Sequence, residues 1–156
     1  MSSRAFKHAL TQEVAYNSLL AHRRRQFHDQ TARTLETLYP DRLEDHYSAL
    51  ARHYLLGDDA RRAFQYAHLA AEQAASRAAY SDALNLIEAA LKLVDVLPED
   101  AERLRTELAL RSIESIVGSV LFGFSSHRRE HTIRRMCELG ERIGEREELV
   151  GGDRFI

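Results

Sequence analysis

The sequence predicts an all-α protein in which antiparallel helical hairpins stack as a short α-solenoid of about seven helices. Composition is the first reason. Of the 156 residues, 44% are apolar, 29% are charged, and only two are proline and seven glycine. The abundant Ala, Leu, Glu and Arg are good helix formers. The second reason is a regular helical periodicity between residues 59 and 97. A chain of this length can bury roughly two-thirds of its unfolded surface, which is enough for a core.

The first forty residues predict two helices separated by a basic cluster. The first helix runs from Phe6 to Leu20, and the cluster is Arg23 to Arg25. One face of the second helix carries Phe27, Thr31, Leu35 and Leu38. Pro40 cannot continue this helix, because proline lacks the backbone N–H and clashes with the preceding turn.

A third helix is expected between Asp41 and Gly57. Asp41 with Glu44 three residues later resembles a capping box. The predicted buried side consists of Leu43, Tyr47, Leu50, Ala51 and Tyr54. Gly57 is a typical helix stop, and Asp58 or Asp59 is a suitable N-cap for the next helix.

The stretch from Asp59 to Leu97 predicts two antiparallel helices with a break at Tyr80 and Ser81. One side of the first helix carries small side chains with a single phenylalanine: Ala60, Ala63, Phe64, Ala67, Ala71, Ala74 and Ala78. The second helix carries the larger aliphatic residues Leu84, Ile87, Leu91 and Val94. Small residues facing large ones allow the two backbones to approach closely.

Two further helices and the start of another are expected after residue 97. Pro98 at a first helical position, followed by the acidic Glu99 and Asp100, predicts the start of the sixth helix. Its apolar face runs through Leu104, Leu108, Ala109, Ile113, Ile116, Val117 and Val120. The seventh helix should run from His127 to Ile143, end at Gly144, and turn inward Ile133, Met136, Cys137 and Leu139. Residues 146–156 predict a truncated further helix, so we expect a fragment of a longer protein.

Charge and cysteine content narrow the function classes. The formal net charge is −2 and no apolar run approaches the ~18 residues of a membrane span, so neither nucleic acid nor membrane is an expected partner. The single cysteine fits a reducing compartment, and we expect a cytoplasmic protein. Arg23 to Arg25 lack the aromatic interleaving of a nucleic-acid surface, so they predict a solvated face or a contact with another domain.

One stretch resembles a tetratricopeptide repeat. The residues that carry the likeness are Ala78, Tyr80, Ala83, Ile87, Ala90, Leu91 and Pro98, with three extra residues before the proline. The likeness covers residues 64–98, and the sixth and seventh helices resemble a longer, diverged repeat. It implies a helical scaffold that binds a protein or peptide on its concave face. It also places Gln65, His68 and Glu72 on the groove-lining side, in agreement with their three- and four-residue spacing.

The sequence up to about residue 144 is similar to the segment that follows the ATPase module in large bacterial signalling proteins. These proteins combine a class III adenylate/guanylate cyclase domain, an AAA/STAND-type ATPase and a helical-repeat tail. The residues that carry the likeness are Phe6, His8, Leu10, Glu13, Tyr16, Arg23 to Arg25, His28, Leu43, His46, Tyr47, His53 and Tyr54. It implies that residues 1–40 end a winged-helix region and contact the ATPase module, and that residues 41–145 are the repeats. His8 would then be a nucleotide-sensing residue of the parent protein.

The expected function is therefore a non-catalytic regulatory and protein-interaction segment without a cofactor. The phosphate-binding pattern GxxxxGK[ST] is absent from the sequence. Two alternatives remain: the same segment in an ATPase-type transcriptional activator, and a helical metallohydrolase using the HxxEH stretch His127, Glu130 and His131. The second is disfavoured because two arginines lie inside the motif. An unpaired terminal repeat could also self-associate.

Overall fold

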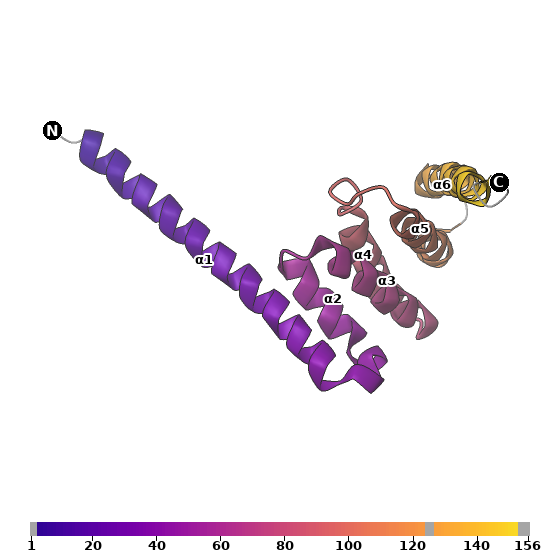
Figure 1. Ribbon diagram of the computed structural model, residues 1–156, viewed down its shortest axis with the longest axis horizontal. Coiled ribbons are helices and arrows are strands. Elements are labelled where there is room, and N and C mark those ends of the chain that lie inside the picture. Colours follow the sequence, from indigo (N-terminus) through magenta and orange to yellow (C-terminus); the bar gives the residue numbers. More distant parts are fainter. Residues whose placement is uncertain (1–2, 124–126, 153–156) are drawn as a thin grey trace.

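The computed structural model describes residues 3–123 and 127–152, and within these ranges the regular structure is helical, without a strand (Figure 1). The elements in order are α1 (Ser3–Leu38), η1 (Pro40–His46), α2 (Tyr47–Leu56), α3 (Ala60–Ser76), α4 (Tyr80–Leu91), α5 (Ala101–Phe122) and α6 (His127–Gly152). The all-α prediction is confirmed. Within the described ranges there are six α-helices and one 3-10 helix. In the same ranges no helix has the length and apolarity that a bilayer crossing requires.

The first two predicted helices form one continuous helix, α1, so the predicted separation at Arg23 to Arg25 was wrong. The segment contains neither glycine nor proline, and arginine is a good helix former, so the charge cluster does not interrupt the hydrogen-bond ladder. Figure 1 shows that the N-terminal half of α1 extends away from the other helices, while its C-terminal half packs beside α2.

The apolar face predicted for the second helix mostly points to solvent. Phe27 is 66% exposed and Leu38 is 63% exposed, whereas Ala32 is fully buried. The small Ala32 allows α2 to pack closely, and the half-buried Leu35 of the predicted face packs against the same cluster. Polar side chains also lie on this inner side. The Nδ1 atoms of His28 and His53 lie 2.9 Å apart across the two helices.

α1 also holds the turn between α2 and α3. The carboxylate of Asp29 accepts a hydrogen bond from the backbone N–H of Asp58 at 2.9 Å. Gly57 lies directly against it, because a Cβ added at Gly57 would be 1.9 Å from Asp29 Oδ1. Arg25 forms an ion pair with Asp58 at 2.7 Å. A side chain at Gly57 would therefore displace the Asp29 carboxylate.

The capping box predicted at Asp41 and Glu44 was wrong. Pro40 instead begins the 3-10 helix η1, whose N-cap residue Tyr39 makes no side-chain capping bond. Arg42, with φ −140° and ψ 34°, kinks this short helix internally, and His46, with φ −115° and ψ 3°, separates it from α2. The predicted inner side of α2 is largely confirmed: Leu50, Ala51 and Tyr54 are buried, and Leu43 and Tyr47 are half-buried.

The predicted α3–α4 hairpin is confirmed, with its break moved by three residues. Asp59 is the N-cap of α3 and accepts from the N–H of Arg62 at 3.1 Å. The helix ends at Ser76, and Ala78 has a positive φ of 59°. The N–H groups of Ala78 and Ala79 donate to carbonyls of the last turn, as in a Schellman motif. The core contains Ala63, Phe64, Ala67, Ala70, Ala71, Ala83, Ile87 and Ala90.

α5 begins three residues later than predicted. Asp100 is its N-cap and accepts from the N–H of Arg103 at 2.8 Å, so Pro98 and Glu99 precede the helix. The predicted apolar face is only partly correct. Leu104 and Val117 are buried, and so is Leu110, but Ile116 and Val120 are 66% and 58% exposed. Ile116 and Val120 share a face of α5 that is exposed among the described residues, whereas Val117 beside them lies on the buried face.

α6 packs antiparallel to α5. It differs from the prediction in where it ends and in which residues it buries. It continues through Gly144 to Gly152, so Gly144 does not end it. Leu139 is buried as expected, but Ile133 is 42% exposed and Cys137 is exposed. Thr132 is buried in their place. The reason is that the α5 surface facing α6 is charged, as described below.

Candidate functional site

A shallow groove of about 310 Å³ opens where η1, α2, α3 and α5 meet. Its lining residues are Leu43, Tyr47, Gln65, Tyr66, His68, Leu69 and Thr106. The rings of Tyr47 and Tyr66 lie with centroids 6.2 Å apart and form part of its apolar wall. Apolar walls with a few polar groups are typical of binding sites, whose volumes are about 300–1,000 Å³. The groove has the size for one large side chain of a partner.

Hydrogen bonds between α3 and α5 fix one end of the groove. The guanidinium of Arg61 donates to the carboxylates of Asp100 and Glu102. The side-chain amide of Gln65 also donates to Glu102. The bond from Arg61 lowers the pKa of Asp100, which keeps this carboxylate charged while it caps α5. At the other side, Gln73 donates to the backbone carbonyl of Glu44 at 2.9 Å and holds η1 against α3.

His68 is the histidine of the groove lining. Burial lowers its pKa, and the nearby carboxylate of Glu72 opposes this effect only in part. His68 is therefore neutral at pH 7, since its pKa lies below the ordinary 6.5. A neutral imidazole carries one donor and one acceptor nitrogen, so it can bond to a peptide backbone in either direction.

The structure brings together two of the three residues that the sequence placed on a binding face. Gln65 and His68 both line the groove. Glu72, one helical turn further on, is exposed and lies outside the lining. No sequence pattern indicated Leu43, Tyr47 or Thr106 in this role, because they come from other elements and reach the groove only through packing. The role of all these residues in binding stays a prediction.

A carboxylate of α1 lies behind the groove wall. Glu36 accepts from the hydroxyl of Tyr66 at 2.7 Å and from that of Tyr54 at 2.8 Å. It also accepts from Arg62 at 2.7 Å. The rings of Tyr54 and Tyr66 are stacked, with centroids 5.5 Å apart. Burial raises the pKa of Tyr54 to about 12 and also raises that of Tyr66, so both hydroxyls remain donors at neutral pH. One side chain thus connects α1 with the groove.

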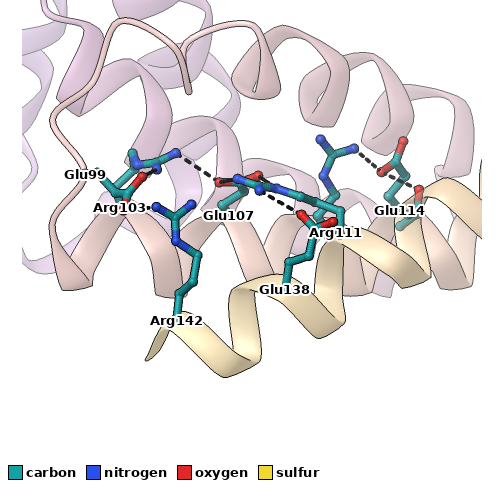
Figure 2. A network of polar contacts seen from close by, with 9 residues as sticks. Glu99, Arg103, Glu107, Arg111, Glu114, Glu138 and Arg142 are labelled. Atoms are coloured by element: carbon teal, nitrogen blue, oxygen red, sulfur yellow. Dashed lines mark hydrogen bonds and ion pairs between the residues drawn. The ribbon is translucent and has the colours of Figure 1, made fainter. Parts of the chain in front are cut away.

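A second polar network joins α5 to α6, and sequence reasoning missed it. Figure 2 shows its charged side chains meeting between the two helices. Glu107, only 1% exposed, accepts from Arg103 at 3.0 Å and from Arg135 at 2.9 Å. Thr132 donates to Glu114 at 3.1 Å. The signal was present in the sequence, because Glu99, Arg103, Glu107, Arg111 and Glu114 alternate in charge at three- and four-residue steps.

The other candidate residues remain separate from the groove. The side chains of His8 and His127 lie outside those that the structure describes. Glu130 bonds to Arg134 on the surface, and His131 is exposed. Among the described residues, no group of three or more His, Cys, Asp or Glu side chains is arranged to hold a metal ion. The metallohydrolase alternative, which needs His127, stays a prediction.

Comparison with known proteins gives no information about function. No protein-family model, no curated protein and no solved structure matches the sequence. What the molecule does is therefore inferred from its surface and its internal contacts.

Proposed function

We propose that the chain is a non-catalytic protein-interaction and regulatory segment that binds a peptide or protein partner in the groove between η1, α2, α3 and α5. The groove itself carries this proposal. It combines the apolar walls of Leu69 and Tyr66 with the neutral imidazole of His68, on a face fixed by hydrogen bonds. A partner side chain would fill the hollow, and the imidazole would bond to the partner's backbone.

A tetratricopeptide-like stacking of hairpins is the architecture that we propose for this function. In its support, α3 packs on α4, α5 packs on α6, and α5 contacts both α3 and α4. Three residues of the repeat likeness, Ala83, Ile87 and Ala90, are fully buried. Stacked helical hairpins of this kind commonly bind partners on their concave face.

We place the segment in a bacterial signalling ATPase linked to a nucleotide cyclase, on the strength of the sequence likeness. The same segment in an ATPase-type transcriptional activator is the alternative, and the sequence upstream of Met1 distinguishes them. In this proposal, a bound partner biases the adjoining ATPase between two states by about 1–3 kcal/mol, the usual size of allosteric coupling. The bond from Tyr66 to Glu36 supports such coupling, since it joins the groove wall to α1.

Selection of peptides from a displayed library on the whole chain tests the binding role. We expect enriched peptides to lose about tenfold or more in affinity with Leu69→Ser or Thr106→Arg, because both changes alter the groove lining. Leu56→Ser is the matched control, since Leu56 is 50% exposed at the opposite end of α2. Failure to enrich any groove-dependent peptide would contradict the proposal.

The coupling is tested separately in the parent protein. Tyr66→Phe retains the ring of the groove wall and removes the hydroxyl that donates to Glu36. We expect peptide affinity to change little and the effect of the peptide on ATPase rate to decrease. An unchanged effect on the rate would refute this route while leaving the binding role intact.

A further inference from the structure

α1 carries a row of uncovered side chains on the side away from α2. The row, named here the outer stripe, consists of Leu20, Phe27, Thr31, Thr34 and Leu38. Steps of seven, four, three and four residues place them along one line of the helix. Phe27 and Leu38 are 66% and 63% exposed, and Leu20 is 40% exposed. The outer stripe is therefore an apolar surface without a covering element among the described residues.

The stripe is hollowed at its centre, and the hollow is mainly apolar. A depression of about 300 Å³ is lined by Phe27, Gln30, Thr31, Thr34 and Leu35. The hydroxyls of Thr31 and Thr34 each donate at 2.8 Å to a carbonyl of the preceding helical turn. Because these hydroxyls are already bonded, both threonines present mainly their methyl groups to a partner.

Two arginines beside the stripe have no acidic partner among the described residues. Arg23 and Arg24 lie between Leu20 and Phe27, both are exposed, and neither is in an ion pair within the described residues. In contrast, Arg25 on the inner side pairs with Asp58. Between residues 17 and 38 the acidic side chains are Asp29 and Glu36, and both bond inward, to α2 and α3 or the turn between them. The charge beside the stripe is thus only basic.

We infer that the outer stripe is a docking surface for an acidic amphipathic helix of a partner protein, separate from the groove. From Leu20 to Leu38 the stripe measures about 27 Å, or five helical turns, which matches an ordinary helix. Aliphatic side chains at three- and four-residue spacing in the partner would cover Phe27, and flanking Glu or Asp would pair with Arg23 and Arg24. A second copy of the chain fits less well, because its own stripe has no acidic residue to offer these arginines.

Binding of two designed helical peptides to the full chain tests the inference. Both have leucine along one face, and the flanking positions are glutamate in the acidic peptide and lysine in the basic one. By fluorescence anisotropy we expect the acidic peptide to bind about tenfold tighter or more, with a preference that declines between about 50 mM and about 500 mM salt. Phe27→Ser should weaken binding about tenfold, and Arg23→Gln with Arg24→Gln should remove the preference. Val96→Ser, at a residue 69% exposed beyond α4, is the control and should change nothing.

Several outcomes would overturn the inference. One is equal affinity for the two peptides, another is absence of binding, and a third is binding that Phe27→Ser leaves unchanged. Self-association of the chain that Phe27→Ser abolishes, measured by sedimentation, would assign the stripe to a second copy. Stripe-dependent binding to phosphatidylserine vesicles without binding to the acidic peptide would assign it to a membrane surface. Phe27 is largely exposed, so its replacement should leave the fold intact, which circular dichroism checks.

Discussion

Replacing Glu107 by glutamine should destabilise the protein more than any surface charge change. The carboxylate is 1% exposed and accepts hydrogen bonds from two guanidinium groups, those of Arg103 and Arg135. Arg103 is itself only 5% exposed. The neutral amide would leave these two cations close together without their shared counter-charge.

The size of the effect follows from the remaining partners. Removing one member of a buried ion pair typically lowers the free energy of unfolding by about 3–5 kcal/mol. Arg103 retains Glu99 at 3.1 Å and Arg135 retains Glu138 at 3.1 Å, so the cost should lie at the low end. We expect a loss of about 3 kcal/mol in the free energy of unfolding. For a chain of this size, that lowers the Tm by about 6–12 °C.

Urea denaturation followed by circular dichroism measures the difference, and Glu130→Gln is the matched control. Glu130 pairs with Arg134 at 3.3 Å on α6, where both side chains are 69% exposed, so its loss should cost less than about 0.5 kcal/mol. Leucine at all three of the positions Arg103, Glu107 and Arg135 should recover most of the stability, because no charge remains buried. Equal effects of Glu107→Gln and Glu130→Gln would refute the reasoning.

Three further predictions concern the backbone and pH. Ala78→Gly should stabilise the protein by about 1 kcal/mol, because Ala78 has a φ of 59° and an L-residue there costs about 1–2 kcal/mol; Ala89→Gly inside α4 should lose about 1 kcal/mol, and a loss for both would contradict the prediction. Gly57→Ala should cost about 1–3 kcal/mol through its clash with Asp29. Asp29→Ala should reduce that cost in a double-mutant cycle, and strictly additive effects would disprove the contact. Burial lowers the pKa of His53 from 6.5, so protonation favours the unfolded chain and the free energy of unfolding should fall as the pH drops below 6.5. The fall should be smaller in His53→Gln, and identical pH profiles by thermal denaturation would argue against it.

The sequence was most informative where local chemistry decides the structure. The α3–α4 hairpin was predictable because small and large side chains recur at helical spacing, and because Asp59 is a good N-cap. Predictions of helix boundaries failed where they rested on a charge cluster or on a single capping residue, because other residues decided where the helix began or ended. Arg23 to Arg25 do not break α1. Of the two acidic residues that follow Pro98, Asp100 rather than Glu99 is the N-cap of α5.

The candidate groove was only half predictable for a related reason. Gln65 and His68 share one helix, so their spacing placed them on one face. Leu43 and Thr106 come from η1 and α5, and no pattern within one helix can show that they meet. The α5–α6 interface was missed because we took burial to require apolar residues, whereas Glu107 and Arg103 are buried as a pair.

Because α1 is one continuous helix, a movement at its packed end is transmitted to its N-terminal end. From Ser3 to His22, which lies 3.8 Å from Asp58 in the α2–α3 turn, the helix is about 30 Å long. A rotation of its packed end by about 10° would move the far end by about 5 Å, simply from its length. Small changes at Glu36 and the stacked tyrosines would therefore become large displacements at the N-terminal end.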